Sequence, residues 1–274
     1  MRTLKNQTLL YDQDCPLCSV YTTGFIKSGM LDANGRKSYC DLSETTYNFV
    51  DFNRATNEIA LVDTKNKTVV YGIDSLLKVI GFSFPWISKI GYLKPINFFL
   101  KKLYSFISYN RKVIIPSNIK KEETLECVPD YNYKYRIFYI LFTALITILV
   151  LYNYSHSLSM LSKSTITRES LLTFGQLIFQ SIFLLKLDKK VVFNYIGNLM
   201  TVSLMGSLLL IPILLLNTII NIPENGLLIW FGLTVFIMFI EHYRRIKILE
   251  LPTYLSYIWV VYRMIVLLII INLS

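Results

Sequence analysis

Charged side chains are scarce in this chain. They make up 17% of its 274 residues, whereas hydrophobic residues make up 53%. The shortage is concentrated after Tyr135, because residues 136–274 hold only 10 basic and 5 acidic side chains. This composition excludes a protein that is soluble throughout. It predicts a soluble N-terminal domain followed by an all-α transmembrane helical domain.

The sequence also lacks a secretory signal and a nucleic-acid-binding motif. Residues 1–14 contain no long apolar core and no small-residue cleavage site, so we expect the N-terminal domain to stay in the cytoplasm. No basic helix or aromatic-interleaved basic strand accompanies the net charge of +10, so nucleic acid is not an expected partner. Basic loops that flank membrane spans explain this charge more simply.

Long apolar runs fill the C-terminal half. A spanning helix takes about 20 mainly apolar residues, because its backbone hydrogen bonds must be satisfied internally. We expect about five spans, over residues 136–154, 170–187, 193–219, 227–240 and 255–273. The second is the shortest of these. The lipid bilayer is therefore an expected partner of the chain.

Basic residues alternate between the loops that join these spans. The loops after the second and fourth spans are the richer ones, with Lys186, Lys189 and Lys190 in the first and Arg244, Arg245 and Lys247 in the second. Because Lys and Arg favour cytoplasmic loops, we predict a multi-pass protein of the cell (inner) membrane. Its N-terminal domain would be cytoplasmic and, after five spans, its C-terminus outside.

A few polar residues fall inside the predicted spans. Arg263 lies near the middle of the fifth, where a charge usually faces a partner, a cavity or a functional site. The alternative is snorkelling beside Tyr262. We therefore expect a membrane-protein partner near Arg263, and we interpret Gln176 and Gln180 as contacts between helices. Haem is not expected, because the chain has only 2 histidines and they are predicted on opposite sides.

The N-terminal residues alternate between strand and helix patterns. Residues 7–11 and 36–42 fit strands, and residues 59–72 fit a β-hairpin. A helix is predicted from Pro16 to about Met30, since proline suits the first turn of a helix. A β-α-β half followed by a β-β-α half, with C-x-x-C after the first strand, is the thioredoxin-like arrangement.

This pattern sets the expected domains. We predict an α/β thioredoxin-like domain over residues 1–116, a juxtamembrane linker over 117–135 and the transmembrane helical domain over 136–274. Within the first domain, residues 85–116 alternate aromatic side chains with lysines and arginines. They fit a segment resting on an anionic membrane surface. They equally fit helices that cover the sheet while their basic residues stay solvated.

The Cys15-Pro16-Leu17-Cys18 motif supplies the candidate chemistry. A helix N-terminus lowers the pKa of a thiol, so Cys15 is the expected attacking thiol and Cys18 the resolving thiol. Asp12 and Asp14 are candidate catalytic carboxylates. Their charge opposes ionisation of Cys15, but a carboxylate here can accept the proton of Cys18. Asp14 also fits a helix cap.

Three stretches bear a family resemblance. LLYDQDCPLC resembles the D-G-D-C-P-x-C signature of the DCC family of predicted thiol-disulfide oxidoreductases, also catalogued as DUF393. VVYGIDSLLKVI is similar to that family's strand followed by G-x-D-A and a helix, and LYSFISYNRKVI to its aromatic-rich helix ending in N-R. The resemblance covers Leu9–Pro116 and implies a dithiol enzyme without a built-in cofactor. Gln13 departs from the usual glycine and Ser75 from the common alanine. No proline precedes the third strand, where thioredoxins have a cis-proline.

The two remaining cysteines do not complete a metal site. Cys40 and Cys127 lack C-x-x-C spacing, whereas structural zinc sites bring their ligands as local pairs, so we expect no metal. Cys40 fits a buried apolar position, and Cys127 fits a linker thiol or a third redox thiol.

Two functions follow from these observations. The first is a membrane-tethered thiol-disulfide oxidoreductase that acts on protein or small-molecule thiols and disulfides through Cys15 and Cys18. The second is a non-catalytic subunit of a membrane protein complex, in which the thioredoxin-like domain serves for binding. Electron transfer across the membrane is disfavoured, because no cysteine lies in a predicted span.

Overall fold

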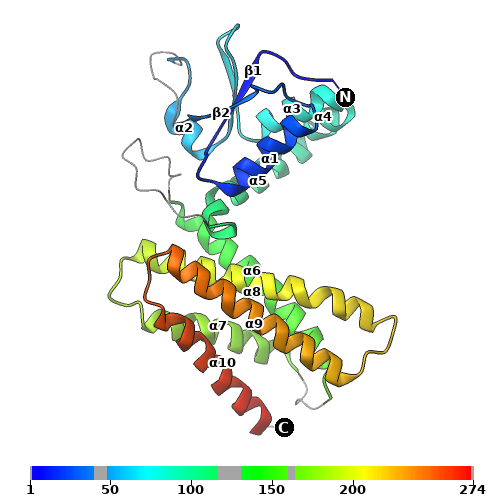
Figure 1. Ribbon diagram of the computed structural model, residues 1–274, viewed down its shortest axis with the longest axis vertical. Coiled ribbons are helices and arrows are strands. Elements are labelled where there is room, and N and C mark those ends of the chain that lie inside the picture. The colour runs from blue at the N-terminus through cyan, green and yellow to red at the C-terminus, as the bar shows by residue number, and fades with distance from the viewer. Residues whose placement is uncertain (1, 40–47, 117–130, 160–163, 273–274) are drawn as a thin grey trace. The chain divides into compact units, whose positions relative to one another are not determined.

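The chain forms two compact units, Met1–Tyr135 and Arg136–Ser274. The computed structural model describes residues 2–39, 48–116, 131–159 and 164–272 (Figure 1). Cys40, Cys127 and most of the predicted linker lie outside the described residues. The interpretations of these two cysteines therefore stay predictions.

A four-stranded mixed sheet forms the centre of the first unit. Its strands are β1 (Gln7–Tyr11), β2 (Arg36–Ser38), β3 (Ala60–Asp63) and β4 (Thr68–Tyr71), in the order β2-β1-β3-β4. β1 runs parallel to β2 and antiparallel to β3, and β3 is antiparallel to β4. This is the predicted thioredoxin-like arrangement, with the hairpin where it was expected.

Two consecutive leucines of β1 fix the packing on both faces of the sheet. Successive side chains of a strand point to opposite faces, and Leu9 and Leu10 are both fully buried. Leu9 packs in a cluster with Leu31 and Val79, whereas Leu10 packs with Val50 and other residues on the opposite side. A strand with two buried faces is typical of a sheet covered by helices on both sides.

Within the described part of the first unit, five helices accompany this sheet. They are α1 (Pro16–Lys27), α2 (Phe52–Asn57), α3 (Ile73–Ser83), α4 (Pro85–Gly91) and α5 (Lys94–Ile114). Proline opens α1, as predicted, and the helix ends three residues before Met30. Gly72 precedes α3 with φ +62°, and a Cβ there would lie 2.9 Å from Glu58 Oε2. The glycine that the family pattern places here therefore has a conformational reason.

The second unit is helical throughout its described residues. Its helices are α6 (Tyr133–His156, whose first turn belongs to the first unit), α7 (Ile166–Ile182), α8 (Lys189–Asn217), α9 (Glu224–Ile248) and α10 (Tyr254–Asn272). Four of them, all except α7, are long and apolar enough to cross a membrane. These four are compatible with a membrane protein.

The expectation of about five spans is thus approximate. α7 has 17 residues, a length of roughly 25 Å at the helical rise, so it is shorter than the other four helices. Arg244, Arg245 and Lys247 were expected in a loop but lie within α9. The helix is longer than its apolar core because Glu241 pairs with both arginines across one turn.

Polar side chains join the helices of this unit. Gln180 accepts a hydrogen bond from Tyr195 Oη at 2.9 Å and donates to the Leu255 carbonyl at 3.3 Å. Tyr195 Oη also lies 3.2 Å from His242 Nε2. The interpretation of Gln180 as a contact between helices is therefore confirmed. Gln176 Nε2 has no hydrogen-bond partner among the described residues.

Candidate functional site

The turn from β1 into α1 positions the two cysteines. The amide of Cys15 donates to the Asp12 carbonyl at 3.2 Å, and the amide of Asp14 donates to Asp12 Oδ1 at 3.0 Å. Cys15 is then the N-cap of α1, with φ −97° and ψ 106°, and its Sγ accepts a hydrogen bond from the Cys18 amide at 3.3 Å. The interpretation of Asp14 as the cap was therefore wrong, because sulfur occupies the place of the usual oxygen.

Gln13 fits this turn without a left-handed backbone. Among the described residues, the only non-glycine positions with positive φ are Asn6, Lys67 and Glu250. The departure from the family's glycine therefore adds no strain to the turn. Both cysteines keep their places at the start of the helix.

A buried ion pair lies behind the motif. Arg111 of α5 places Nη2 2.9 Å from Asp12 Oδ2 and donates to the Thr56 carbonyl at 3.1 Å. Both side chains of the pair are almost completely buried, so each charge depends on the other for its stability. The position of Arg111 beside Asp12 was not predicted from the sequence, although the N-R of the family pattern falls on this residue.

Arg111 and the pairing of the sulfurs shift the thiol pKa values. The hydrogen bond from the Cys15 thiol lowers the pKa of Cys18 to about 7, and Arg111 adds to this effect against the cost of burial. The pKa of Cys15 is raised, first because it keeps the shared proton and then because it is buried. Coupled thiols lose protons in steps that belong to the pair. The pair therefore loses its first proton near neutral pH.

The carboxylate of Asp12 is harder to ionise than usual. Burial raises the pKa of Asp12, while Arg111 and the Asp14 amide oppose that shift. An Asp with a raised pKa is a better proton acceptor once it is ionised. This supports the predicted role of Asp12 toward Cys18, while the role of the Asp14 carboxylate stays a prediction.

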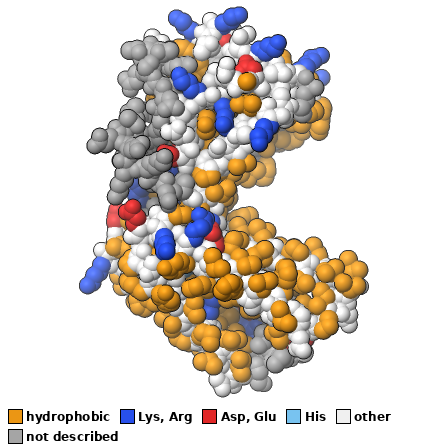
Figure 2. Space-filling model, in the orientation of Figure 1, with side chains coloured by type: hydrophobic (Ala, Val, Ile, Leu, Met, Phe, Trp, Pro, Cys, Tyr) orange, Lys and Arg blue, Asp and Glu red, His pale blue; other side chains and the backbone are white. Residues whose placement is uncertain are grey.

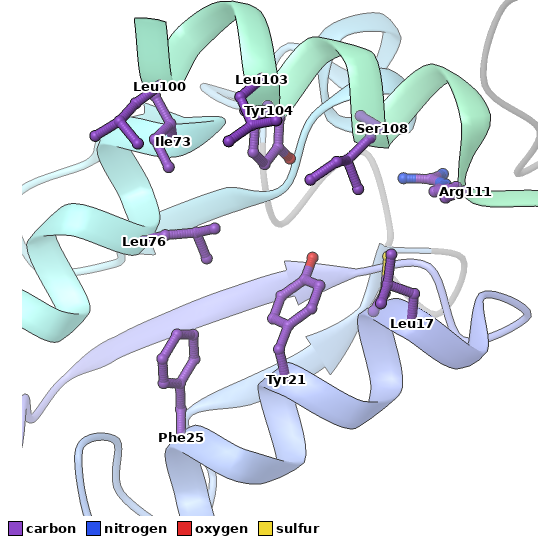
Figure 3. Close-up of a pocket in the computed structure, with 12 residues that line it drawn as sticks. Leu17, Tyr21, Phe25, Ile73, Leu76, Leu100, Leu103, Tyr104, Ser108 and Arg111 are labelled. Atoms are coloured by element: carbon purple, nitrogen blue, oxygen red, sulfur yellow. The ribbon is translucent and has the colours of Figure 1, made fainter. Parts of the chain in front are cut away.

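An apolar groove of about 300 Å³ reaches the motif (Figure 3). α1, α3 and α5 supply its walls, which include Leu17, Leu76 and Leu103. Of the two motif sulfurs, only that of Cys18 belongs to a lining residue, and Arg111 lies at the same end of the groove. A substrate group that approaches through this groove would therefore reach Cys18 before Cys15.

Both thiols are reduced and buried in this arrangement. Cys15 is 2% exposed and Cys18 is 4% exposed. Within the described ranges, no group of three or more His, Cys, Asp or Glu side chains is arranged to hold a metal ion. The chemistry that these residues can perform together is thiol exchange, once a substrate or a movement of the first turn of α1 opens access.

A thioredoxin-like sheet with a C-x-x-C at the start of its first helix defines a dithiol domain of the thiol-disulfide exchange class. Residues 9–115 match the family model of the DCC1-like thiol-disulfide oxidoreductases. The first unit therefore carries a DCC1-like domain, and the family resemblance is confirmed over this range. No curated protein and no solved structure matched the chain. The family match supports a redox function.

Proposed function

We propose that this chain is a membrane-tethered thiol-disulfide oxidoreductase that uses the Cys15–Cys18 couple. One observation carries the proposal: Cys15 Sγ accepts a hydrogen bond from the Cys18 amide at the N-terminus of α1, and the neighbouring Cys15 thiol, with buried Arg111 beside it, lowers the pKa of Cys18 to about 7. A free thiol with the usual pKa of about 8.5 is mostly protonated at neutral pH. The pair instead supplies a thiolate under the conditions of the cytoplasm.

The exchange proceeds in two displacements. Cys15 passes the shared proton to the Cys18 thiolate and attacks one sulfur of a substrate disulfide, so that a mixed disulfide forms and one substrate thiolate leaves. Cys18 then gives its proton to Asp12 and attacks Cys15 Sγ, which releases the second substrate thiol. The dithiol is oxidised by two electrons and the substrate disulfide is reduced by two. The same steps in reverse oxidise a substrate dithiol.

The groove indicates the character of the substrate. Its lining is almost entirely aliphatic and aromatic, so it favours a disulfide whose neighbouring group is apolar. Ile73→Gln places a polar group in this lining and should raise the KM for dibenzyl disulfide several-fold. Val20→Gln, at an exposed apolar residue of α1 outside the groove, is the matched control and should leave the KM unchanged.

Redox titration and trapping of the full chain in detergent micelles test the couple. Cys40 and Cys127 are replaced by serine so that Cys15 and Cys18 are the only thiols that can react. We expect a reversible Cys15–Cys18 disulfide with a potential between about −180 and −270 mV, and alkylation by iodoacetamide that follows a pKa near 7. Two unreactive thiols at neutral pH, with no intramolecular disulfide, would refute the proposal.

The same preparation assigns the roles of the two thiols. If Cys15 attacks, Cys18→Ser accumulates the mixed disulfide and Cys15→Ser does not. The position of Cys18 along the groove argues for the opposite order. If the mixed disulfide accumulates only with Cys15→Ser, Cys18 is the attacking thiol and Cys15 the resolving thiol. The proposed Cys15–Cys18 couple would still stand.

A second candidate function is a subunit of a membrane complex. Arg263 of α10 lies over the Trp259 ring, 4.2 Å from its centroid, and its buried Nε has no acceptor among the described residues. A guanidinium inside a candidate span favours an acidic partner. Cross-linking in native membranes tests this: Arg263→Gln should abolish a cross-linked product that Arg244→Gln, at an exposed arginine, leaves unchanged.

We further propose that the protein resides in the cell (inner) membrane and that its first unit lies on the cytoplasmic side. Lys186, Lys189 and Lys190, which lie before and at the start of α8, support this orientation. The cytoplasm keeps thiols reduced, so the expected net direction is reduction of substrate disulfides. A C-terminus outside requires α7 to cross the membrane.

A further inference from the structure

Helices α4 and α5 expose an apolar surface on the first unit. Its most exposed members are Phe98, Phe99 and Trp86, which are 66%, 63% and 62% exposed. The full set, called here the α4–α5 surface, is Phe82, Trp86, Ile90, Leu93, Phe98, Phe99, Leu103 and Ile107. Soluble monomers rarely leave so many large apolar side chains together in water, so this surface has an occupant.

The spacing of these residues explains why they gather on one side. Trp86 and Ile90 are four residues apart on α4, and Phe99, Leu103 and Ile107 repeat the interval on α5, while Phe82 lies at the end of α3. Residues four apart share a helix face. α5 has a second, neighbouring face, where Tyr104 receives a hydrogen bond from the Ile59 amide and Ser108 donates to the Asn57 carbonyl. The helix therefore covers the domain with one face and leaves the other unpartnered.

The segment that carries this apolar surface has basic side chains and no acidic ones. Residues 81–116 contain no Asp or Glu, and the lysines among them that are exposed are Lys89, Lys94, Lys101 and Lys102. Lys101 pairs with Asp74 at 3.1 Å, while Lys102 lies over the Phe98 ring. Figure 2 shows hydrophobic side chains beside basic ones, Lys or Arg, on the first unit. A lysine stem beside an aromatic ring, with its ammonium outward, is the arrangement found at a membrane interface.

We propose that the α4–α5 surface docks on an anionic lipid leaflet. The aromatic and aliphatic side chains would enter the headgroup boundary, while Lys89, Lys94 and Lys102 contact lipid phosphates. The chain supplies the tether, because α5 ends at Ile114 and the candidate span α6 begins at Tyr133. Leu103 and Ile107 also line the groove beside Cys18, so an apolar substrate dissolved in the leaflet would enter the groove without crossing water.

Quenching of Trp86 fluorescence by brominated lipids tests this docking in the full chain. The protein is placed in nanodiscs of phosphatidylcholine, with or without about 40% phosphatidylglycerol. The Trp86 signal is obtained as the difference between wild type and Trp86→Phe, because Trp230 and Trp259 lie in candidate spans. We expect bromolipid to quench this signal in anionic discs, and quenching to weaken in neutral discs and in high salt.

Lysine substitution provides the matched comparison. Removing three lysines, as Lys89→Gln/Lys94→Gln/Lys102→Gln, should lower the docked-to-undocked ratio about a hundredfold. Lys5→Gln/Lys65→Gln/Lys67→Gln removes the same charge from exposed lysines elsewhere on the unit and should leave quenching unchanged.

Two results would overturn the proposal. Quenching of Trp86 by aqueous iodide but not by bromolipid would place the surface in water. Shielding from both quenchers would mean that protein covers it, either the second unit or another copy of the chain. The outcome does not depend on the cysteines, so it stands apart from the proposed oxidoreductase function.

Discussion

Arg111 is the residue whose replacement tests the proposed site most severely. Arg111→Met removes the guanidinium and keeps much of the side-chain volume, so that the Asp12 carboxylate is left buried without its partner. Breaking one member of a buried ion pair costs about 3–5 kcal/mol. Arg54→Met is the matched control, because Arg54 pairs with Glu58 at the surface and such pairs contribute about 1 kcal/mol or less.

The loss should depend on pH in a defined direction. Burial already raises the pKa of Asp12 in the folded state, and Arg111 opposes that shift, so the variant has a still higher pKa. A carboxyl group whose pKa is higher in the folded state than in the unfolded state stabilises the folded state at acid pH. This stabilisation is lost as pH rises. The stability gap between Arg111→Met and wild type should therefore widen as pH rises through the folded pKa of Asp12 in the wild type, which already lies above the usual 3.8, and should stop widening above the higher pKa of the variant.

Hydrogen exchange of the β1 and β3 amides in the full chain measures this gap, at about pH 4.5 and about pH 7.5. The double variant Asp12→Asn/Arg111→Met should recover most of the loss, because no buried charge remains. The alkylation profile should also move above the wild-type value of about 7, since Arg111 lowers the pKa of Cys18. An equal loss at both pH values, or one no larger than that of Arg54→Met, would refute the reasoning.

Two further predictions concern residues that support the site, and a third concerns the number of membrane spans. Tyr104→Phe removes the oxygen that accepts from the Ile59 amide at 2.9 Å; it should cost about 1–3 kcal/mol by hydrogen exchange, and no loss would mean that water replaces it. Gly72→Ala forces a side chain to φ +62° and against Glu58; we expect a loss of at least about 1 kcal/mol in the same assay, partly relieved by Glu58→Ala. A protease site appended after Ser274 should be cut from outside the cell if α7 crosses the membrane, and only after lysis if just the four longer helices cross.

Much of the fold could be predicted from local patterns. Leu9 and Leu10, the hairpin of residues 59–72 and Pro16 each encode an element through spacing or backbone preference, and all of these elements are present. The position of Cys15 at the start of a helix was equally readable, because proline at a first helical position is a local signal. The long apolar runs of the second unit fixed four helices for the same reason.

The remaining features depend on which segments pack together. Arg111 and Asp12 are 99 residues apart, and the groove beside Cys18 exists only because α5 lies next to α1 and α3. Helical periodicity placed Arg111 on a basic helix but could not say that this side chain turns inward to a carboxylate. The length of α7 depends on where its ends pack, which hydropathy does not record. Local sequence therefore decided the elements and the dithiol motif. Long-range packing decided which charge lies beside that motif, because burial beside a partner is a property of the assembled core.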